Sequence, residues 1–179
     1  MLLTSLSLNK TFRGIIEPFS IKFREGLNII VGENGSGKSS LFALLIDEGH
    51  YKNMITLDRK ENISFMFFDT EKSNPRIQAE IRNGYDVASR FKSHGEALLP
   101  VLTGSKNFKD MLVFIDEPEA GISLSNQKKI LEAFQEAVKN GCQIIIATHS
   151  YFFIKTVPEV FNMDSKTWES SKEYLKRLE

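Results

Sequence analysis

A glycine-rich run between two apolar segments is the first place in this sequence where chemistry is expected. Its pattern, Gly32-x-x-x-x-Gly37-Lys38-Ser39, is the one in which backbone N–H groups wrap around phosphate groups. Glycines let the backbone approach closely, and the following helix points the positive end of its dipole at the phosphates. The residues expected to contact a nucleotide are Gly32, Glu33, Asn34, Gly35, Ser36, Gly37, Lys38, Ser39 and Ser40.

Two side chains of this loop are expected to act directly on ATP. Lys38 would reach the β- and γ-phosphates, and Ser39 would ligate Mg²⁺. The alternative is an ordinary glycine-rich turn with a surface lysine. The apolar strand expected over 27–31 and the apolar helix expected over 41–46 favour phosphate binding, because the pattern needs that context.

Two adjacent carboxylates follow a continuous apolar run, Leu112-Val113-Phe114-Ile115. Such a run predicts a buried strand, and the C-terminal ends of parallel strands face the ligand site of an open α/β sheet. Asp116 would hold Mg²⁺, directly or through water, and Glu117 would orient or deprotonate the attacking water. The alternative is a pair of solvated acids that cap the next segment.

A histidine stands just past another buried strand, in the run Ala147-Thr148-His149-Ser150. At that position His149 can contact the γ-phosphate and help to place the water. Lys38, Glu117 and His149 are therefore the expected catalytic residues. The alternative for His149 is a structural or solvated side chain.

Composition sets limits on the kind of protein. The 179 residues suit a single domain over 1–179, and Lys+Arg and Asp+Glu are both 23. This zero net charge gives no support to a large basic face for nucleic acid. The lone Cys142 suggests a reducing compartment, and neither a signal peptide nor an apolar run long enough to span a membrane is recognisable. We therefore expect a cytoplasmic protein that does not associate with a membrane.

The order of apolar runs predicts the fold class. Strand–helix alternation with near-continuous apolar strands indicates an α/β fold with a mostly parallel sheet flanked by helices. The first thirty residues differ, since they show one strand after another and predict an antiparallel β flap. Residues 50–62 show no clear pattern, and residues 166–178 are expected to form a terminal helix.

The order of the three motifs resembles that of the ABC-type ATPase family of P-loop NTPases. The runs Asp116-Glu117-Pro118-Glu119-Ala120-Gly121-Ile122-Ser123 and Ile146-Ala147-Thr148-His149-Ser150 are similar to its soluble branch, which includes SMC-, RecF- and OLD-like ATPases and small stand-alone ATPases. The resemblance covers residues 2–163. It implies Mg²⁺-dependent ATP hydrolysis, an ATP-dependent homodimer that drives or licenses a protein partner, and a role in DNA repair or phage and defence biology.

The middle of the chain departs from the family pattern. The family's Leu-Ser-Gly-Gly-Gln signature is matched best by Lys92-Ser93-His94-Gly95-Glu96, in a helical region reduced to about 70–105. The resemblance implies that Ser93 and Gly95 contact the ATP of the other subunit; the alternative is an exposed turn. The family's glutamine after the middle strand is missing, and Asp69 or Glu71 could replace it.

Other interpretations remain open at this stage. Phe12 and Arg13 lie where related proteins contact the base, but a packed aromatic and a solvated arginine fit equally well. The altered signature favours a nucleotide-gated interaction module with little turnover. An ATPase subunit of a transporter and a DNA-binding protein are further alternatives. The missing glutamine and the short helical region argue against the transporter, and the charge argues against DNA binding.

Overall fold

Short apolar strands form the central sheet of the protein. A computed structural model describes residues 1–69 and 94–179, except the side chains of residues 94–98. The strand order is β5 (Phe65–Asp69), β6 (Leu112–Asp116), β7 (Gln143–Ala147), β3 (Leu27–Val31), β8 (Glu159–Asn162) and β9 (Thr167–Ser170). Neighbouring strands from β5 to β8 are parallel, and β9 runs antiparallel to β8. The predicted α/β fold with a mostly parallel sheet is confirmed.

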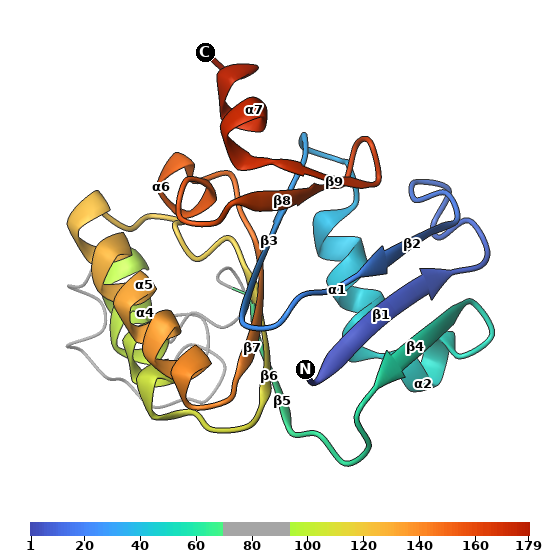
Figure 1. The fold of residues 1–179 in the computed structure, drawn as a ribbon, viewed down its shortest axis with the longest axis horizontal. Coiled ribbons are helices and arrows are strands. Elements are labelled where there is room, and N and C mark those ends of the chain that lie inside the picture. The colour runs from blue at the N-terminus through green and yellow to red at the C-terminus, as the bar shows by residue number, and fades with distance from the viewer. Residues whose placement is uncertain (70–93) are drawn as a thin grey trace, which may run out of the picture.

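Both faces of this sheet are covered, which explains why its strands are apolar without interruption. On one face lie α5 (Leu124–Lys139), α4 (His94–Gly104), α6 (Tyr151–Ile154) and α7 (Ser171–Lys176) (Figure 1). On the other face lie α1 (Lys38–Ile46) and the second sheet. Successive residues of β3 alternate between the two cores, because successive side chains of a strand point to opposite faces.

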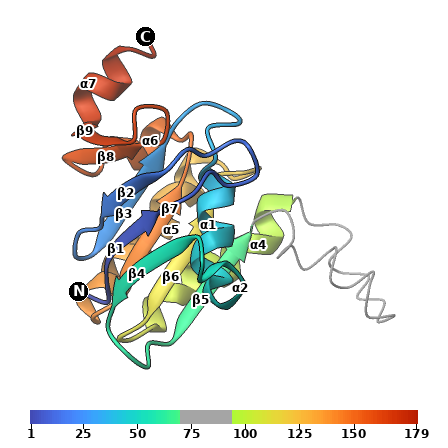
Figure 2. The same cartoon turned by 90° about the vertical axis from the view of Figure 1, so that its right-hand side faces the viewer.

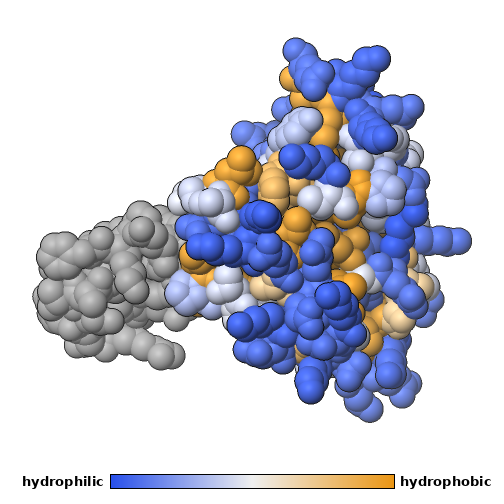
Figure 3. Space-filling model, turned by 60° about the vertical axis from the view of Figure 1, so that its left-hand side comes forward, coloured by the Kyte–Doolittle hydropathy of each residue, from blue (hydrophilic) through white to orange (hydrophobic). Residues whose placement is uncertain are grey.

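The two layers that cover the central sheet differ in solvent exposure. Helix α5 buries one apolar face, with Ile130 and Phe134 fully buried against the sheet. Hydrophilic residues form most of the molecular surface on this side, with hydrophobic areas between them (Figure 3). Helix α1 instead lies between the two sheets, and Leu41, Phe42 and Leu44 are fully buried (Figure 2). Its apolar residues on several sides follow from that position.

The predicted N-terminal flap is a three-stranded antiparallel sheet in the order β2-β1-β4. Strands β1 (Leu3–Leu8) and β2 (Phe19–Lys22) lie in the regions expected, and β4 (Ile55–Arg59) lies in the segment that showed no pattern. Only Ile55 of β4 is buried, so the alternation that marks a strand is weak there. A short helix, α2 (Glu48–Tyr51), precedes β4.

The prediction of a single terminal helix over 166–178 is wrong for the first part of that range. Residues Thr167–Ser170 form strand β9, and the helix α7 covers Ser171–Lys176. Tertiary contacts of Trp168 explain the difference. Its ring packs on Phe161 of β8 with centroids 5.6 Å apart, and its indole N–H donates to the Lys22 carbonyl at 3.0 Å. Pairing with β8 thus outweighs the weak helical tendency of the segment.

One buried side chain joins the two sheets. Gln143, at the start of β7, accepts the backbone N–H groups of Leu2 and Leu3 at 2.9 and 2.7 Å. Its amide donates to the carbonyls of Leu3 and Arg24 at 2.9 and 2.8 Å. The amide therefore satisfies four backbone groups that the central sheet alone would leave without partners.

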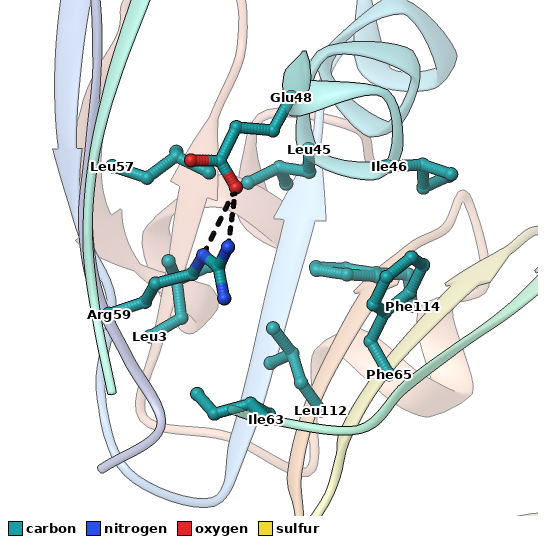
Figure 4. Close-up of a pocket in the computed structure, with 10 residues that line it drawn as sticks. All are labelled: Leu3, Leu45, Ile46, Glu48, Leu57, Arg59, Ile63, Phe65, Leu112 and Phe114. Atoms are coloured by element: carbon teal, nitrogen blue, oxygen red, sulfur yellow. Dashed lines mark hydrogen bonds and ion pairs between the residues drawn. The ribbon is translucent and has the colours of Figure 1, made fainter. Parts of the chain in front are cut away.

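A small pocket lies between the two sheets at the C-terminal end of α1 (Figure 4). Its walls are apolar apart from Arg59 and Glu48, and Arg59 donates from two nitrogens to Glu48 at 3.1 and 2.8 Å. Leu45 and Ile46 line it, so it lies at the opposite end of α1 from Lys38 and the glycine-rich loop. Within the described parts of the chain, no helix is long and apolar enough to cross a membrane.

Candidate functional site

Three adjacent strands bring the predicted site residues to one edge of the central sheet. Strand β7 lies between β3 and β6, and the register sets Ala147 beside both Ile30 and Asp116. The glycine-rich loop follows β3, Glu117 follows β6 and His149 follows β7. Because all three strands are parallel, their C-terminal ends meet at the place where ligands bind in such sheets.

The loop has a backbone shape that only glycine adopts easily. Gly32, Gly35 and Gly37 have φ angles of 144°, 86° and 99°. A Cβ on Gly37 would lie 2.6 Å from Cγ1 of Ile16, and one on Gly32 would lie 2.6 Å from Oγ of Ser36. Gly32 and Gly37 are therefore required for space as well as for backbone conformation, whereas Gly35 has open space around it and is favoured by its conformation alone.

Lys38 is the first residue of α1 and is buried against the loop. Its Nζ donates to the carbonyls of Gly32 and Glu33 at 2.7 and 3.1 Å. Burial lowers the pKa of Lys38, while the nearby carboxylates of Glu117 and Asp116 act in the opposite direction. Among the described residues its hydrogen-bond partners are both carbonyls, so Lys38 can move to a phosphate without breaking an ion pair.

Asp116 ends β6 with a carboxylate that is largely withdrawn from water. Burial raises the pKa of Asp116, and the neighbouring Ser39 hydroxyl lowers it by a smaller amount. Its Oδ1 is buried and has no hydrogen-bond partner among the described residues. Asp69 lies beside it in the register of β5 and β6. Oxygen donors of this kind fit Mg²⁺, and Ser39 and Asp116 could hold the ion between them.

Glu117 and His149 face each other across the ends of β6 and β7. The His149 Nε2 lies 3.9 Å from Oε1 of Glu117, and both side chains are partly exposed. Glu117 has a φ of 50°, and its N–H donates to the Ala147 carbonyl at 2.9 Å. A single pocket of about 180 Å³ is lined by Ile15, Asn34, Gly35, Gly37, Lys38, Ser39, Ser40 and Glu117. This places the Glu117 carboxylate beside the glycine-rich loop.

Several residues that the sequence analysis did not single out also shape the site. Glu119 accepts the backbone N–H of His149 at 2.7 Å, so it fixes the segment that carries the imidazole. Asp164 accepts the N–H of Glu33 at 2.9 Å, from a turn 131 residues away in the sequence. Isolated acids in turns follow no period, so the sequence held no signal that could have found them.

Two further groups were predicted from the sequence: residues that contact the nucleotide base, and residues of the signature. Phe12 is buried and packs edge-on against Tyr51 at 5.0 Å, so the packed-aromatic alternative holds and its ring is not available to a base. Arg13 lies over the Phe12 ring, 5.0 Å from its centroid. Ser93 and Glu71 lie outside the described residues. Gly95 lies within α4 (His94–Gly104), so its backbone is helical.

Comparisons with known proteins agree with this geometry. Residues 97–155 match the family described as "AAA domain, putative AbiEii toxin, Type IV TA system". A search of curated proteins found no match. The solved structures that resemble this chain include UvrA2 from Deinococcus radiodurans, with a TM-score of 0.62 and 13% identity over 88% of this chain.

Two further similar structures are from ABC transporter proteins. One is cbiO1 from Clostridium perfringens, part of the transporter complex cbiONQ, with a TM-score of 0.59 and 17% identity over 97% of this chain and 91% of that one. The other is a bacterial Atm1-family ABC exporter with ATP bound, with a TM-score of 0.57 and 15% identity over 98% of this chain and 40% of that one. The chain spans only 35% of the length of UvrA2. The chain has the fold of an ABC-type P-loop ATPase domain.

Proposed function

We propose that this protein binds ATP with Mg²⁺ and hydrolyses it by attack of water on the γ-phosphate. One observation carries the proposal: Glu117 and the phosphate loop line the same pocket, with the buried Lys38 between them. The ammonium of Lys38, which would face the phosphates, and the carboxylate of Glu117, which would face the water, therefore line the same pocket. This is the arrangement that phosphoryl transfer to water needs.

Each residue has a distinct role in this proposal. Lys38 leaves the carbonyls of Gly32 and Glu33 and neutralises charge on the β- and γ-phosphates. Ser39 and Asp116 would hold Mg²⁺, and the buried Oδ1 of Asp116, which has no partner in the described part of the chain, supports that role. The bound ion supplies additional positive charge to the transferring phosphoryl group. Glu117 orients the attacking water and accepts its proton.

His149 is proposed to contact the γ-phosphate and help to place the water. Two observations support this role: its imidazole lies 3.9 Å from the Glu117 carboxylate, and Glu119 holds its backbone at 2.7 Å. The half-exposed ring is free to meet a phosphate from the open side of the pocket.

The proposal extends to assembly and biological role. Two copies would close around two ATP molecules, with Ser93 and Gly95 of each touching the γ-phosphate held by the other, and the closed dimer would license a protein partner. Support for a role in defence comes from the family matched by residues 97–155, whose description names a toxin. The other suggested role, in DNA repair, rests on the sequence resemblance alone.

The deciding experiment measures phosphate release and nucleotide affinity for wild type, Lys38→Ala and Glu117→Gln. We expect Lys38→Ala to abolish ATP binding, because it removes the cation that faces the phosphates. Glu117→Gln should bind ATP normally and hydrolyse it about 10²-fold more slowly, the usual scale for a positioned base. Lys128→Ala and Glu132→Gln, two exposed positions on α5, are the matched controls and should behave as wild type.

Two results would change the assignment. Equal turnover by Glu117→Gln and wild type would show that Glu117 is not the base. ATP binding by wild type without Mg²⁺-dependent phosphate release would replace the ATPase by a nucleotide-gated interaction module.

A further inference from the structure

The turn between β8 and β9 lies directly beneath the phosphate loop. Met163, which opens this turn, donates its N–H to the Val31 carbonyl at 2.8 Å and is fully buried. A Cβ on Gly32 would lie 3.1 Å from the Met163 Cβ, and one on Gly37 would lie 3.7 Å from its Cε. The Met163 side chain thus supports both ends of the loop.

Asp164 holds the start of the loop. Its Oδ2 accepts the backbone N–H of Glu33 at 2.9 Å, a hydrogen bond between a charged acceptor and the main chain. Such bonds are stronger than neutral ones. The negative charge of Asp164 also helps to keep the pKa of Lys38 from falling further on burial.

Lys166 holds the middle of the loop. Its Nζ donates to the Ser36 carbonyl at 3.4 Å and also to the Met163 carbonyl. The ammonium lies over the ring of Phe19 in β2, 5.2 Å from its centroid. Lys166 therefore joins the loop, the turn and the antiparallel sheet at one point.

Further hydrogen bonds hold the turn between β8 and β9 itself in place. The Asp164 N–H donates to Oδ1 of Asn162 at 2.8 Å, and the Asn162 amide donates to Glu169 at 2.7 Å. Arg177, next to α7, bonds the other Glu169 oxygen at 2.5 Å. A continuous series of hydrogen bonds thus runs from Glu33 to the end of α7, and it holds the backbone of Asp164 in place beneath the loop.

We propose that Asp164 and Lys166 are positioning residues that hold the phosphate loop in its nucleotide-binding shape before a nucleotide arrives. The inference rests on the proposed nucleotide binding and adds residues outside the motif to it. The turn holds the Glu33 N–H and the Ser36 carbonyl, so the segment of the loop from Glu33 to Ser36 is constrained at both of its ends. A loop ordered in advance loses less conformational entropy on binding, which strengthens affinity without new ligand contacts.

The test compares the dissociation constants of fluorescent ATP and ADP for wild type and four variants. Asp164→Ala should weaken both nucleotides by about 10-fold, the scale of one charged hydrogen bond. Asp164→Asn keeps an acceptor oxygen and should stay within about threefold of wild type. Lys166→Met keeps an apolar stem but loses the ammonium that donates to the loop and lies over Phe19, so we expect weakening of several-fold. Ser165→Ala is the control, because among the described residues its hydroxyl bonds only to Thr167 at the start of β9.

Steady-state kinetics separates this role from that of the catalytic residues. Asp164→Ala should raise KM and leave kcat within about threefold, because the loop binds the ground state and the transition state alike. Thermal unfolding of each variant checks that the fold is intact. If Asp164→Ala does not fold, Lys166→Met still decides the question.

The outcomes are distinct. Folded Asp164→Ala and Lys166→Met with wild-type affinity would overturn the inference, since the turn would then only support the fold. Equal losses in Asp164→Asn and Asp164→Ala would overturn the hydrogen-bond acceptor role. Absence of ATP binding by wild type would instead overturn the proposed function on which the inference depends.

Discussion

At the scale of single residues, the carboxylate of Asp116 lies in a position that lowers the stability of the folded protein. Burial raises the pKa of Asp116, and its Oδ1 has no partner within the described residues. A buried acceptor without a partner costs free energy. That cost is expected where a residue is kept for binding a cation rather than for stability.

Asp116→Asn removes the buried negative charge, so it should stabilise the protein in the absence of Mg²⁺ while it abolishes Mg²⁺-dependent hydrolysis. We expect the thermal midpoint to rise by about 2–4 °C, which corresponds to about 1 kcal/mol in a domain of this size. The pKa of Asp116 is raised in the folded state, so the folded protein holds this proton more tightly. The destabilisation by Asp116 hence develops as the pH rises above its ordinary pKa of 3.8 and vanishes below it.

Calorimetry at pH 7 with EDTA measures this difference. A lower midpoint for Asp116→Asn than for wild type under these conditions would contradict the account.

At the scale of elements, the two sheets depend on one polar side chain. The side chain of Gln143 in β7 makes four hydrogen bonds to backbone groups of Leu2, Leu3 and Arg24 in the N-terminal segment. The contact of the antiparallel sheet with β7 is therefore specific, beyond the apolar packing around α1.

Gln143→Leu should reduce the free energy of unfolding by about 3 kcal/mol, because it leaves buried backbone groups without partners. Nucleotide affinity should not change, since Gln143 begins β7 and the site lies at the opposite end of that strand. Urea unfolding measures the stability, with Gln135→Leu on the exposed side of α5 as the control. Equal stability of the two variants would show that the hydrogen bonds contribute little.

At the scale of the whole molecule, the surface beside the site carries two exposed apolar side chains. Leu124 opens α5 and is 64% exposed, and Tyr151 opens α6 and is 55% exposed. The segments that carry them are joined by the Ser150 hydroxyl, which donates to Gln127 of α5 at 2.7 Å. An exposed apolar area beside the candidate site is a place where a second copy could pack.

We expect Glu117→Gln to change from monomer to dimer when Mg·ATP is added, as measured by mass in solution. Adding Leu124→Asp should prevent the dimer and leave ATP binding intact, because a charge replaces an apolar contact. Leu178→Asp, at an equally exposed position beyond α7, is the control and should not affect assembly. A monomer under both conditions with ATP bound would show that this chain does not form the dimer by itself.

The sequence by itself determined the parts of this protein that depend on local pattern. The loop Gly32–Ser40, the pair Asp116 and Glu117, and His149 each follow an apolar strand, so their places at one sheet edge could be predicted. The parallel sheet and the antiparallel flap also followed from continuous and alternating apolar runs.

Only the tertiary structure decided the features that depend on distant partners. Strand β4 exposes most of its residues, and β9 forms because Trp168 packs on Phe161, so neither shows a periodic signal. Phe12 is a core residue because Tyr51 covers it. Asp164 is an ordinary acid in a turn until the fold sets it 2.9 Å from the Glu33 N–H, a contact between segments 131 residues apart that no local pattern encodes.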